Sequence, residues 1–277
     1  MNNTLMSGRR GLVMGVANDH SIAWGIATQL HKHGAELAFT YQGEAFGKRV
    51  KPLADEVGSK LLMPCDVEDI ATVDAVFEAL KKTWGKIDFV VHAIAFSDKN
   101  ELKGKYADTT RENFTRTMVI SCFSFTEIAR RAAALMPDGG SLVTLTYGGS
   151  TRVMPNYNVM GVAKAALESS VRYLAADYGP QGIRVNAISA GPMRTLAGAG
   201  IGEARAMFNY QQNHAPLRRA ITLEEVGGAG LYLLSPLSTG VTGEIHYVDS
   251  GYNIISMPRP EDLKKGVENG GQISPAT

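Results

Sequence analysis

Residues 11–43, GLVMGVANDHSIAWGIATQLHKHGAELAFTYQG, are the part of the sequence that best predicts the fold. Two short apolar runs, Gly11–Val16 and Ala35–Tyr41, are typical of buried strands. Between them, Ser21–His33 carries apolar residues at every fourth position, which is the spacing of one helix face. A strand, a helix and a second strand in this order favour two parallel strands joined by a crossover helix.

The same alternation continues along the chain. Further strands are predicted at Lys60–Pro64, Ile87–Ala95, Ser141–Thr146, Ile183–Ser189 and Glu244–Val248. Further helices are predicted at Glu44–Val57, Ile70–Trp84, Arg111–Met136, Asn156–Tyr178, Glu203–Gln212 and Leu223–Leu234. This pattern predicts an α/β fold, a single doubly wound (Rossmann-type) domain with a mainly parallel seven-stranded sheet and helices on both faces.

We expect one dinucleotide-binding and catalytic domain over residues 1–260. The segment Gly191–Gly202 is rich in glycine and alanine, and with the short helix after it predicts a substrate lid at about 191–213. An ordinary surface loop would have a similar composition. The last residues, 261–277, carry Pro, Gly and charge without apolar periodicity, so we expect a disordered tail there.

Composition excludes several classes of protein. The 28 Lys and Arg residues nearly balance the 27 Asp and Glu residues, so nothing in the overall charge favours nucleic acid or an anionic membrane. No run of eighteen apolar residues predicts a transmembrane helix. The two cysteines, Cys65 and Cys122, form neither a disulfide framework nor a metal motif. We therefore expect a cytoplasmic protein with no metal, no nucleic acid partner and no membrane contact.

Ligands of doubly wound sheets bind at the carboxyl ends of the strands. After the first strand, Gly15 allows a close backbone approach, and Ser21 could cap a helix whose N-terminus would face a pyrophosphate. The usual G-x-G-x-x-G motif is absent, and an ordinary capped strand-to-helix turn explains these residues equally well.

The next three strand ends carry polar residues. Gln42 can hydrogen-bond ribose hydroxyls but offers no charge to a 2′-phosphate, which favours NAD over NADP. Lys48 and Arg49 could reverse that preference or form a solvated helix face. Asp66 could accept from an adenine amino group, cap the following helix, or do both. His92 is interpreted as a satisfied core residue.

The strongest candidate site combines Tyr147, Tyr157 and Lys164. Tyr157 begins a predicted helix and Lys164 follows seven positions later, so both lie on one helix face with Met160 between them. A nearby ammonium can lower the pKa of a phenol and make it a useful donor to a developing oxyanion. On spacing alone, amphipathic surface residues would give the same pattern.

Together, these residues resemble the NADH-dependent enoyl-acyl-carrier-protein reductases of bacterial type II fatty-acid synthesis. This family is a divergent branch of the short-chain dehydrogenase/reductases, whose ordinary members carry Tyr-x3-Lys. Here Tyr157 and Lys164 have the longer spacing, and Gly161 stands where the lysine of the shorter motif would be. The resemblance runs from about Gly11 to Met257.

By position, the resemblance implies the following site. The residues expected to bind NAD are Gly15, Ser21, Ile22, Gln42, Asp66, Val67, Ile94, Lys164, Met193, Arg194, Thr195, Leu196 and Ala197. The residues expected to contact substrate are Ser97, Tyr147, Met160 and Ile201. The residues expected to be catalytic are Tyr147, Tyr157 and Lys164.

The resemblance also implies a mechanism. Hydride passes to the β-carbon of a trans-2-enoyl thioester, and Tyr157 donates a hydrogen bond to the enolate oxygen while Lys164 holds the nicotinamide ribose. Expected partners are an acyl-carrier-protein-bound enoyl substrate and three further copies of the chain in a homotetramer. The alternatives are a ketoreductase or alcohol dehydrogenase of the same superfamily, which the Tyr157 to Lys164 spacing disfavours, and a dinucleotide-sensing regulator.

Overall fold

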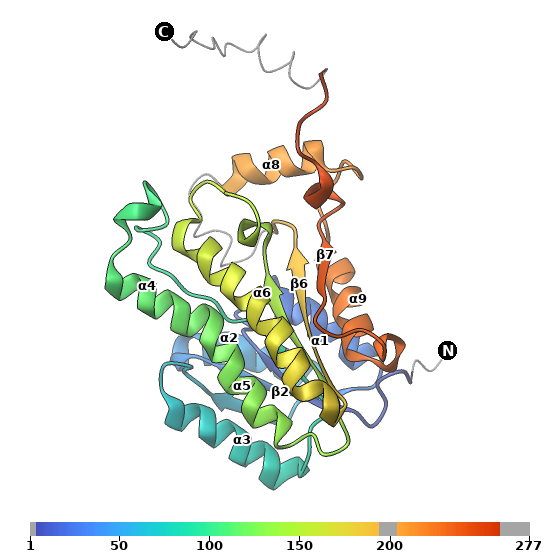
Figure 1. Ribbon diagram of the computed structural model, residues 1–277. Coiled ribbons are helices and arrows are strands. Elements are labelled where there is room, and N and C mark those ends of the chain that lie inside the picture. Colours follow the sequence, from blue (N-terminus) through green and yellow to red (C-terminus); the bar gives the residue numbers. More distant parts are fainter. Residues whose placement is uncertain (1–3, 194–203, 261–277) are drawn as a thin grey trace, which may run out of the picture.

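The computed structural model describes residues 4–193 and 204–260, which contain a seven-stranded sheet (Figure 1). Its strand order is β3-β2-β1-β4-β5-β6-β7, and every neighbouring pair is parallel. The strands are β1 Arg10–Met14, β2 Glu36–Tyr41, β3 Leu61–Pro64, β4 Phe89–His92, β5 Gly140–Thr146, β6 Ile183–Ala190 and β7 Ile245–Val248. The predicted fold class is therefore confirmed.

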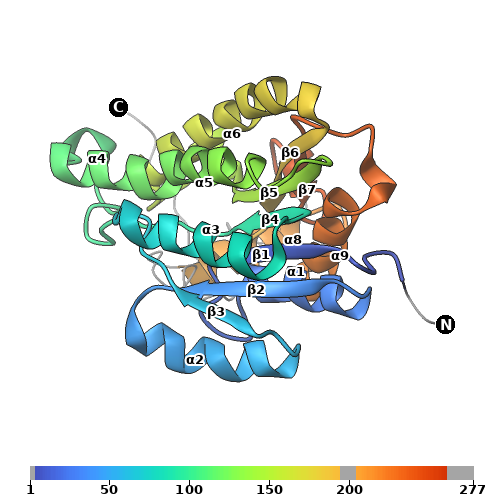
Figure 2. The same cartoon turned by 90° about the horizontal axis from the view of Figure 1, so that it is seen from below.

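Helices cover both faces of this sheet, as Figure 2 shows. One buried core lies between the sheet and α3, α5 and α6, and a second lies between the sheet and α1, α2 and α9. The helices are α1 Ile22–Lys32, α2 Gly43–Glu56, α3 Ile70–Trp84, α4 Arg111–Met118, α5 Ser124–Ala133, α6 Asn158–Tyr178, α8 Ala204–His214 and α9 Leu223–Leu234.

The predicted helix Arg111–Met136 is interrupted. A π-helical turn, Val119–Phe123, separates α4 from α5. Within it, the Ser121 hydroxyl accepts from the N–H of Phe96 and donates to the carbonyl of the same residue, both at 3.0 Å. Ser124 donates to the carbonyl of Ile120 at 2.6 Å. Hydrophobic periodicity alone does not reveal this interruption, because Ser121 is held by a residue far away in the chain.

The fourth strand is shorter than the predicted Ile87–Ala95. It ends at His92, and the last ladder bond beyond it runs from the N–H of Ala93 to the carbonyl of Met14. From there the chain leaves the sheet toward the π turn, where Ser121 holds Phe96. The chain order of the strands reverses between β1 and β4, so the switch point lies beside this exit.

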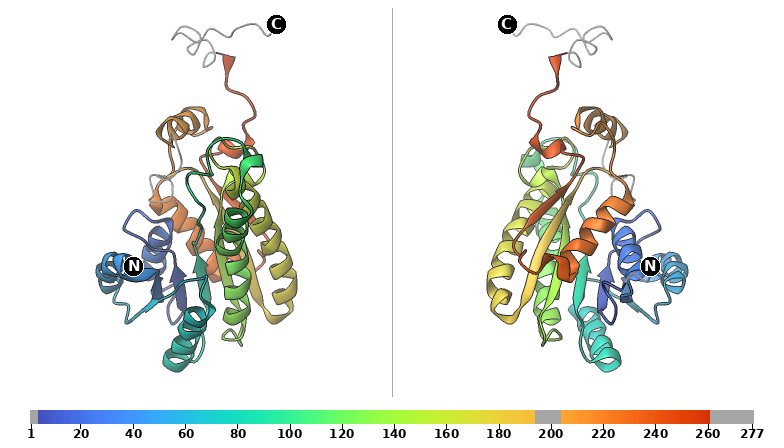
Figure 3. Two further views of the ribbon diagram at one scale, coloured as in Figure 1. Left: turned by 90° about the vertical axis from the view of Figure 1, so that its left-hand side faces the viewer. Right: turned by 90° about the vertical axis from the view of Figure 1, so that its right-hand side faces the viewer.

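Helices α1 and α9, far apart in the chain, pack together through glycine. A Cβ at Gly25 would lie 2.7 Å from the carbonyl oxygen of Leu223, and one at Gly227 would lie 2.3 Å from that of Gly25. Both helices lie on the same side of the sheet in Figure 3. Their contact is therefore backbone to backbone and leaves no room for a side chain.

Helix α8 lies across the carboxyl end of the sheet, toward which the arrow of β6 points in Figure 1. Its bounds, Ala204–His214, nearly match those of the predicted helix Glu203–Gln212. Residues 194–203, most of the predicted lid, and the predicted tail 261–277 lie outside the described residues. No helix in the described part of the chain is long and apolar enough to span a membrane.

Candidate active site

The loop after β1 has a local reason for its glycine. Gly15 has a φ of +92°, and a Cβ there would lie 2.0 Å from the carbonyl oxygen of Ala93. The glycine is thus required by the backbone of β4, before any ligand is considered.

Ser21 stands at the N-cap position of α1, but its side chain does not cap the helix. Its hydroxyl accepts from the N–H groups of Ala17 and Asn18, at 3.0 and 3.1 Å. The expected side-chain cap is therefore wrong. Because the hydroxyl is turned toward the loop, it does not occupy the first N–H groups of α1, beginning at Ile22, and the positive end of the helix dipole suits an anionic group.

At the ends of β2 and β3, Gln42 donates through Nε2 to Oδ2 of Asp66 at 2.9 Å. The other carboxylate oxygen of Asp66 accepts from the N–H of Glu68. Helix α3 is capped instead by Asp69, which accepts from the N–H of Ala71 at 3.0 Å. Asp66 is therefore not an N-cap. Gln42 is exposed and Asp66 half-buried here, next to the buried Val67.

The cations proposed as an alternative phosphate site lie one turn into α2. Lys48 and Arg49 are both exposed, and the guanidinium of Arg49 lies 6.0 Å from the centre of the Phe46 ring on the same helix. This arrangement is that of a solvated helix face.

Tyr157 occupies the N-cap position of α6, flanked by two residues with positive φ. Asn156 has a φ of +57° and Asn158 a φ of +31°. The side-chain nitrogen of Asn158 donates to three carbonyl groups of a neighbouring loop, those of Glu101, Lys103 and Gly104. The loop thus fixes an unusual backbone that turns the Tyr157 ring inward.

The long spacing between Tyr157 and Lys164 has a steric cause. A Cβ at Gly149 would lie 2.5 Å from the Tyr157 ring, and one at Gly161 would lie 2.8 Å from the carbonyl oxygen of Gly149. Position 161 therefore has no room for the lysine of a Tyr-x3-Lys motif. The lysine is instead supplied one helical turn later.

Lys164 is almost completely buried, and its Nζ donates to the carbonyl oxygen of Leu145 at 2.8 Å. Burial lowers the pKa of Lys164 to about 8, against the opposing effects of Cys122 and Glu168. Glu168 itself lies one turn further along α6 and accepts from the Thr146 hydroxyl at 2.7 Å. At neutral pH the ammonium is therefore mostly protonated but close to titration.

Tyr147 and Tyr157 form an edge-to-face pair with ring centres 5.2 Å apart. The pKa of Tyr157 lies above its ordinary value, chiefly because the hydroxyl is buried, with further contributions from Tyr147 and Glu168. The expected lowering by Lys164 is therefore wrong, because burial dominates and the neighbouring groups Tyr147 and Glu168 raise the pKa further. Burial likewise raises the pKa of Tyr147 to about 12. Both groups are neutral phenols at physiological pH.

His92 is a core residue, as expected. Its ring nitrogens lie 3.1 Å from the Thr144 hydroxyl and 2.9 Å from the Ser124 hydroxyl. Burial lowers the pKa of His92 to about 3, with a further contribution from Lys164. It is neutral at physiological pH and has no access to substrate.

The predicted substrate positions divide into two groups. Met160 is buried in a small apolar cluster with Tyr157 and Leu102, as a cleft wall should be. Ser97 is tied into a polar network, where its hydroxyl accepts from Thr117 at 2.9 Å and from Asn113 at 3.2 Å. Ile94, expected to contact the cofactor, packs against the core just after β4. The network could not be predicted from the sequence, because its members lie sixteen and twenty residues from Ser97.

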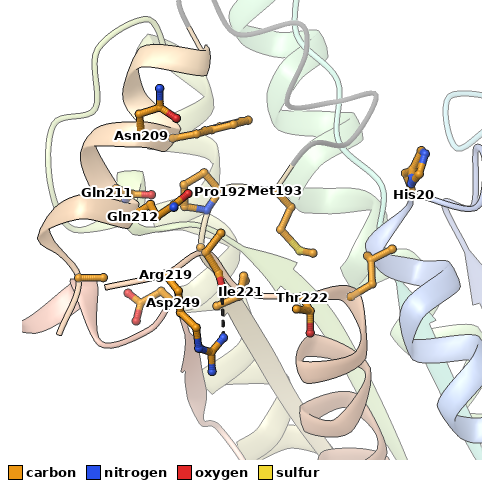
Figure 4. A pocket seen from close by; sticks show the side chains of 15 residues that line it. His20, Pro192, Met193, Asn209, Gln211, Gln212, Arg219, Ile221, Thr222 and Asp249 are labelled. Atoms are coloured by element: carbon orange, nitrogen blue, oxygen red, sulfur yellow. Dashed lines mark hydrogen bonds between the residues drawn. The ribbon is translucent and has the colours of Figure 1, made fainter. Parts of the chain in front are cut away.

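Beneath α8 lies a cavity of about 350 Å³, between the end of β6 and the start of α9 (Figure 4). Among the predicted cofactor residues that the structure describes, Met193 alone lies in its wall. A second space of about 20 Å³ includes Tyr147 and shares three residues with the first, Gly191, Gln211 and Asp249. Gln211 and Asp249 are not identifiable from the sequence because polar residues on a short helix and in a turn are usually solvated.

Other predicted residues cannot be placed. Arg194, Thr195, Leu196, Ala197 and Ile201 lie outside the described residues. Within residues 4–193 and 204–260, no group of three or more His, Cys, Asp or Glu side chains could hold a metal ion.

The donor set at the carboxyl end of the sheet fits a dinucleotide. The N-terminus of α1 suits the pyrophosphate. At neighbouring strand ends, Gln42 offers an uncharged amide and Asp66 offers an acceptor. Lys164 supplies a buried cation. The sequence model of the family described as Enoyl-(Acyl carrier protein) reductase matches residues 15–253. The chain belongs to this reductase family.

Relatives and solved structures agree with this assignment. The chain is 76% identical to NADH-dependent enoyl-acyl-carrier-protein reductase 2 of Rhizobium meliloti (strain 1021), over 95% of this chain and 98% of the relative. It resembles the crystal structure of FabI from Candidatus Liberibacter asiaticus with a TM-score of 0.90 and 63% identity, covering 92% of this chain and 99% of that one.

A further solved structure contains the cofactor. The reductase of Anaplasma phagocytophilum, solved in complex with NAD, has a TM-score of 0.89 and 57% identity, covering 92% of this chain and 97% of that one. The family resemblance, the enzyme class and the expected NAD cofactor are thereby confirmed.

Proposed function

We propose that this chain reduces the trans-2 double bond of enoyl thioesters carried by acyl carrier protein, with NADH as the reductant. The observation that carries the proposal is the buried, protonated hydroxyl of Tyr157 beside Tyr147, on the helix that also holds Lys164. The names of the relatives give the same substrate and cofactor.

Several residues would hold the cofactor. The N–H groups at the start of α1, near Ser21 and Ile22, would take the pyrophosphate, and Gln42 would bond the adenosine ribose without offering a charge to a 2′-phosphate. The Lys164 ammonium would donate to the nicotinamide ribose hydroxyls. The remaining positions proposed to contact NAD are Gly15, Asp66, Val67, Ile94 and Met193 to Ala197. When bound, NADH supplies the hydride.

Tyr157 would act as a hydrogen-bond donor. As the β-carbon of the substrate gains hydride, the electrons of the double bond move toward the carbonyl, and negative charge collects on the thioester oxygen. A protonated phenol aimed at that oxygen stabilises charge that is absent from the ground state, so it accelerates the step. The raised pKa of Tyr157 keeps the donor proton in place across the physiological range. The α-carbon is protonated afterward.

The apolar surroundings of Tyr157 would exclude water from the reacting bond. Met160 and Leu102 are buried beside it, and Tyr147 covers its ring edge-on. Loss of water strengthens the hydrogen bond to the developing charge.

We further propose that the chain forms a homotetramer in the cytoplasm. Large apolar side chains remain exposed on the π turn and α6, among them Phe123 at 53% and Tyr173 at 73%, which supports burial between subunits. The thiols of Cys65 and Cys122 are free and buried, as suits a reducing compartment. Sedimentation equilibrium of the purified chain tests the tetramer, and a monomer at micromolar concentration would refute it.

The central experiment measures initial rates of NADH oxidation with a medium-chain trans-2-enoyl thioester. NADPH and a 3-ketoacyl thioester serve as controls. Turnover with NADH and the enoyl substrate alone supports the proposal. Turnover of the ketoacyl substrate alone would identify a ketoreductase, and NADH binding without turnover of either would favour a dinucleotide-sensing regulator.

A further inference from the structure

Gln211 occupies an unusual place in the lid helix. It lies on α8 with only 8% of its surface exposed, and it lines both the cavity of about 350 Å³ and the smaller one beside Tyr147. Figure 4 shows its side chain in the wall of the larger cavity, close to Pro192. A buried amide at this junction separates the tyrosine pair from the space beneath the lid.

The side chain of Gln211 lines the smaller cavity together with Tyr147, and its interaction with that phenol lowers the pKa of Tyr147 against the larger effect of burial. Its carbonyl oxygen Oε1 is buried and has no hydrogen-bond partner among residues 4–193 and 204–260. A buried acceptor without a partner is unfavourable, so the arrangement is explained if the partner arrives with a ligand.

The geometry of the site limits what that ligand group is. If the thioester oxygen bonds Tyr157, the tyrosine pair extends from the reacting bond toward Gln211, because the Tyr147 ring lies 5.2 Å from that of Tyr157 and Tyr147 lines the same small cavity as Gln211. The arm that carries an acyl group on a carrier protein contains secondary amides, the nearest of which has its nitrogen three bonds from the thioester sulfur. That N–H is a donor of the kind Oε1 lacks.

We propose that Gln211 is a specificity-determining residue, which accepts through Oε1 a hydrogen bond from the amide N–H nearest the sulfur of the substrate arm. The inference rests on the proposed function and deepens it. It distinguishes this residue from Tyr157 and Lys164, because Gln211 recognises the arm and takes no part in the transfer of hydride or proton.

The test compares Gln211→Met, a side chain of similar length without polar donors or acceptors, with the unchanged protein on two thioesters. Both carry the same medium-length trans-2-enoyl group. One is an N-acetylcysteamine thioester, which keeps the amide N–H, and the other is a butyl thioester, which lacks it. We expect kcat/KM of the variant to fall about tenfold on the first and less than about twofold on the second. Equal losses on both, or no loss on either, would overturn the proposal.

Thermal unfolding separates recognition from packing. Because Gln211→Met removes a buried unpaired acceptor, we expect its Tm to equal or exceed that of the unchanged protein. A lower Tm together with equal losses on both thioesters would mean that Gln211 only supports the lid helix. Gln211→Leu gives the same comparison if the methionine variant does not fold.

Two controls complete the design. Asn213→Ala removes an exposed amide from the same helix and should leave both values of kcat/KM unchanged. The unchanged protein with the N-acetylcysteamine thioester reports on the proposed function itself: absence of turnover there refutes the reductase, whereas turnover that does not depend on Gln211 refutes only the present inference.

Discussion

Gly15 at the end of β1 packs against the carbonyl oxygen of Ala93 at the end of β4, so closely that a Cβ would lie 2.0 Å from that oxygen. The contact lies at the switch point of the sheet, where the proposed cofactor would bind. The shape of the cofactor loop is therefore set by a contact between two strands.

Replacement of this glycine should be costly. We expect Gly15→Ala to lower the free energy of unfolding by about 2–4 kcal/mol, because it adds both a positive-φ cost and a backbone clash. Gly58→Ala is the matched control, since Gly58 also has a positive φ, of +65°, but open space around it. Urea denaturation of both variants measures the difference. Equal destabilisation by the two substitutions would show that the clash relaxes without cost.

Tyr157→Phe should separate catalysis from cofactor binding. Loss of the donor to the enolate oxygen should lower kcat about 10²- to 10³-fold, whereas the Kd for NADH should change less than about twofold. Steady-state kinetics and a fluorescence titration with NADH measure the two quantities. Tyr173→Phe, at an exposed position of the same helix, is the control. A parallel rise in Kd would contradict the assigned role.

Lys164→Ala should act mainly on the cofactor. We expect the Kd for NADH to rise about tenfold or more, since hydrogen bonds from a charged donor to the ribose are lost. Because the pKa of Lys164 in the free protein is about 8, NADH affinity should fall as the pH rises through 8 and the ammonium loses its proton. The variant should lack this pH dependence. Lys81→Ala, on the exposed face of α3, should resemble the unchanged protein.

His92 should contribute to acid lability. Its pKa is lowered from 6.5 to about 3, so below pH 6.5 the unfolded chain binds a proton that the folded protein excludes. The resulting loss of stability is about 1.4 kcal/mol for each pH unit between 6.5 and 3. His92→Gln, which has no titrating group, should lack this part of the acid slope. Urea denaturation of both proteins at pH 7 and pH 5 gives the comparison, and identical slopes would refute it.

The elements that could be predicted are those with a repeating local pattern. Strand β1 and helices α1 and α6 follow apolar periods in the sequence, and the spacing of Tyr157 and Lys164 is itself a sequence feature. The sequence does not show that Asp69 rather than Asp66 caps α3, because both residues place a carboxylate shortly before the same helix. The structure separates them through the bond from Gln42 to Asp66.

Features that depend on contacts between distant residues could not be predicted from the sequence. In the π turn, Ser121 bonds Phe96 across twenty-five residues, and Gln211 is buried although its neighbours Tyr210 and Gln212 on α8 are exposed. The raised pKa of Tyr157 could not be predicted for the same reason. The spacing to Lys164 can be counted along a helix, but the burial that raises the pKa is a property of the assembled protein.

The glycine contact between α1 and α9 also affects how the chain is made. Helix α1 ends at Lys32, but α9, the helix that packs against its surface around Gly25, is complete only when synthesis has reached Leu234. At ribosomal rates of about 5–20 residues per second, the interval is on the order of ten to forty seconds. Throughout it, the nascent polypeptide presents an uncovered apolar surface beside the exit tunnel, where a chaperone or a second chain could reach it before the enzyme closes its own core.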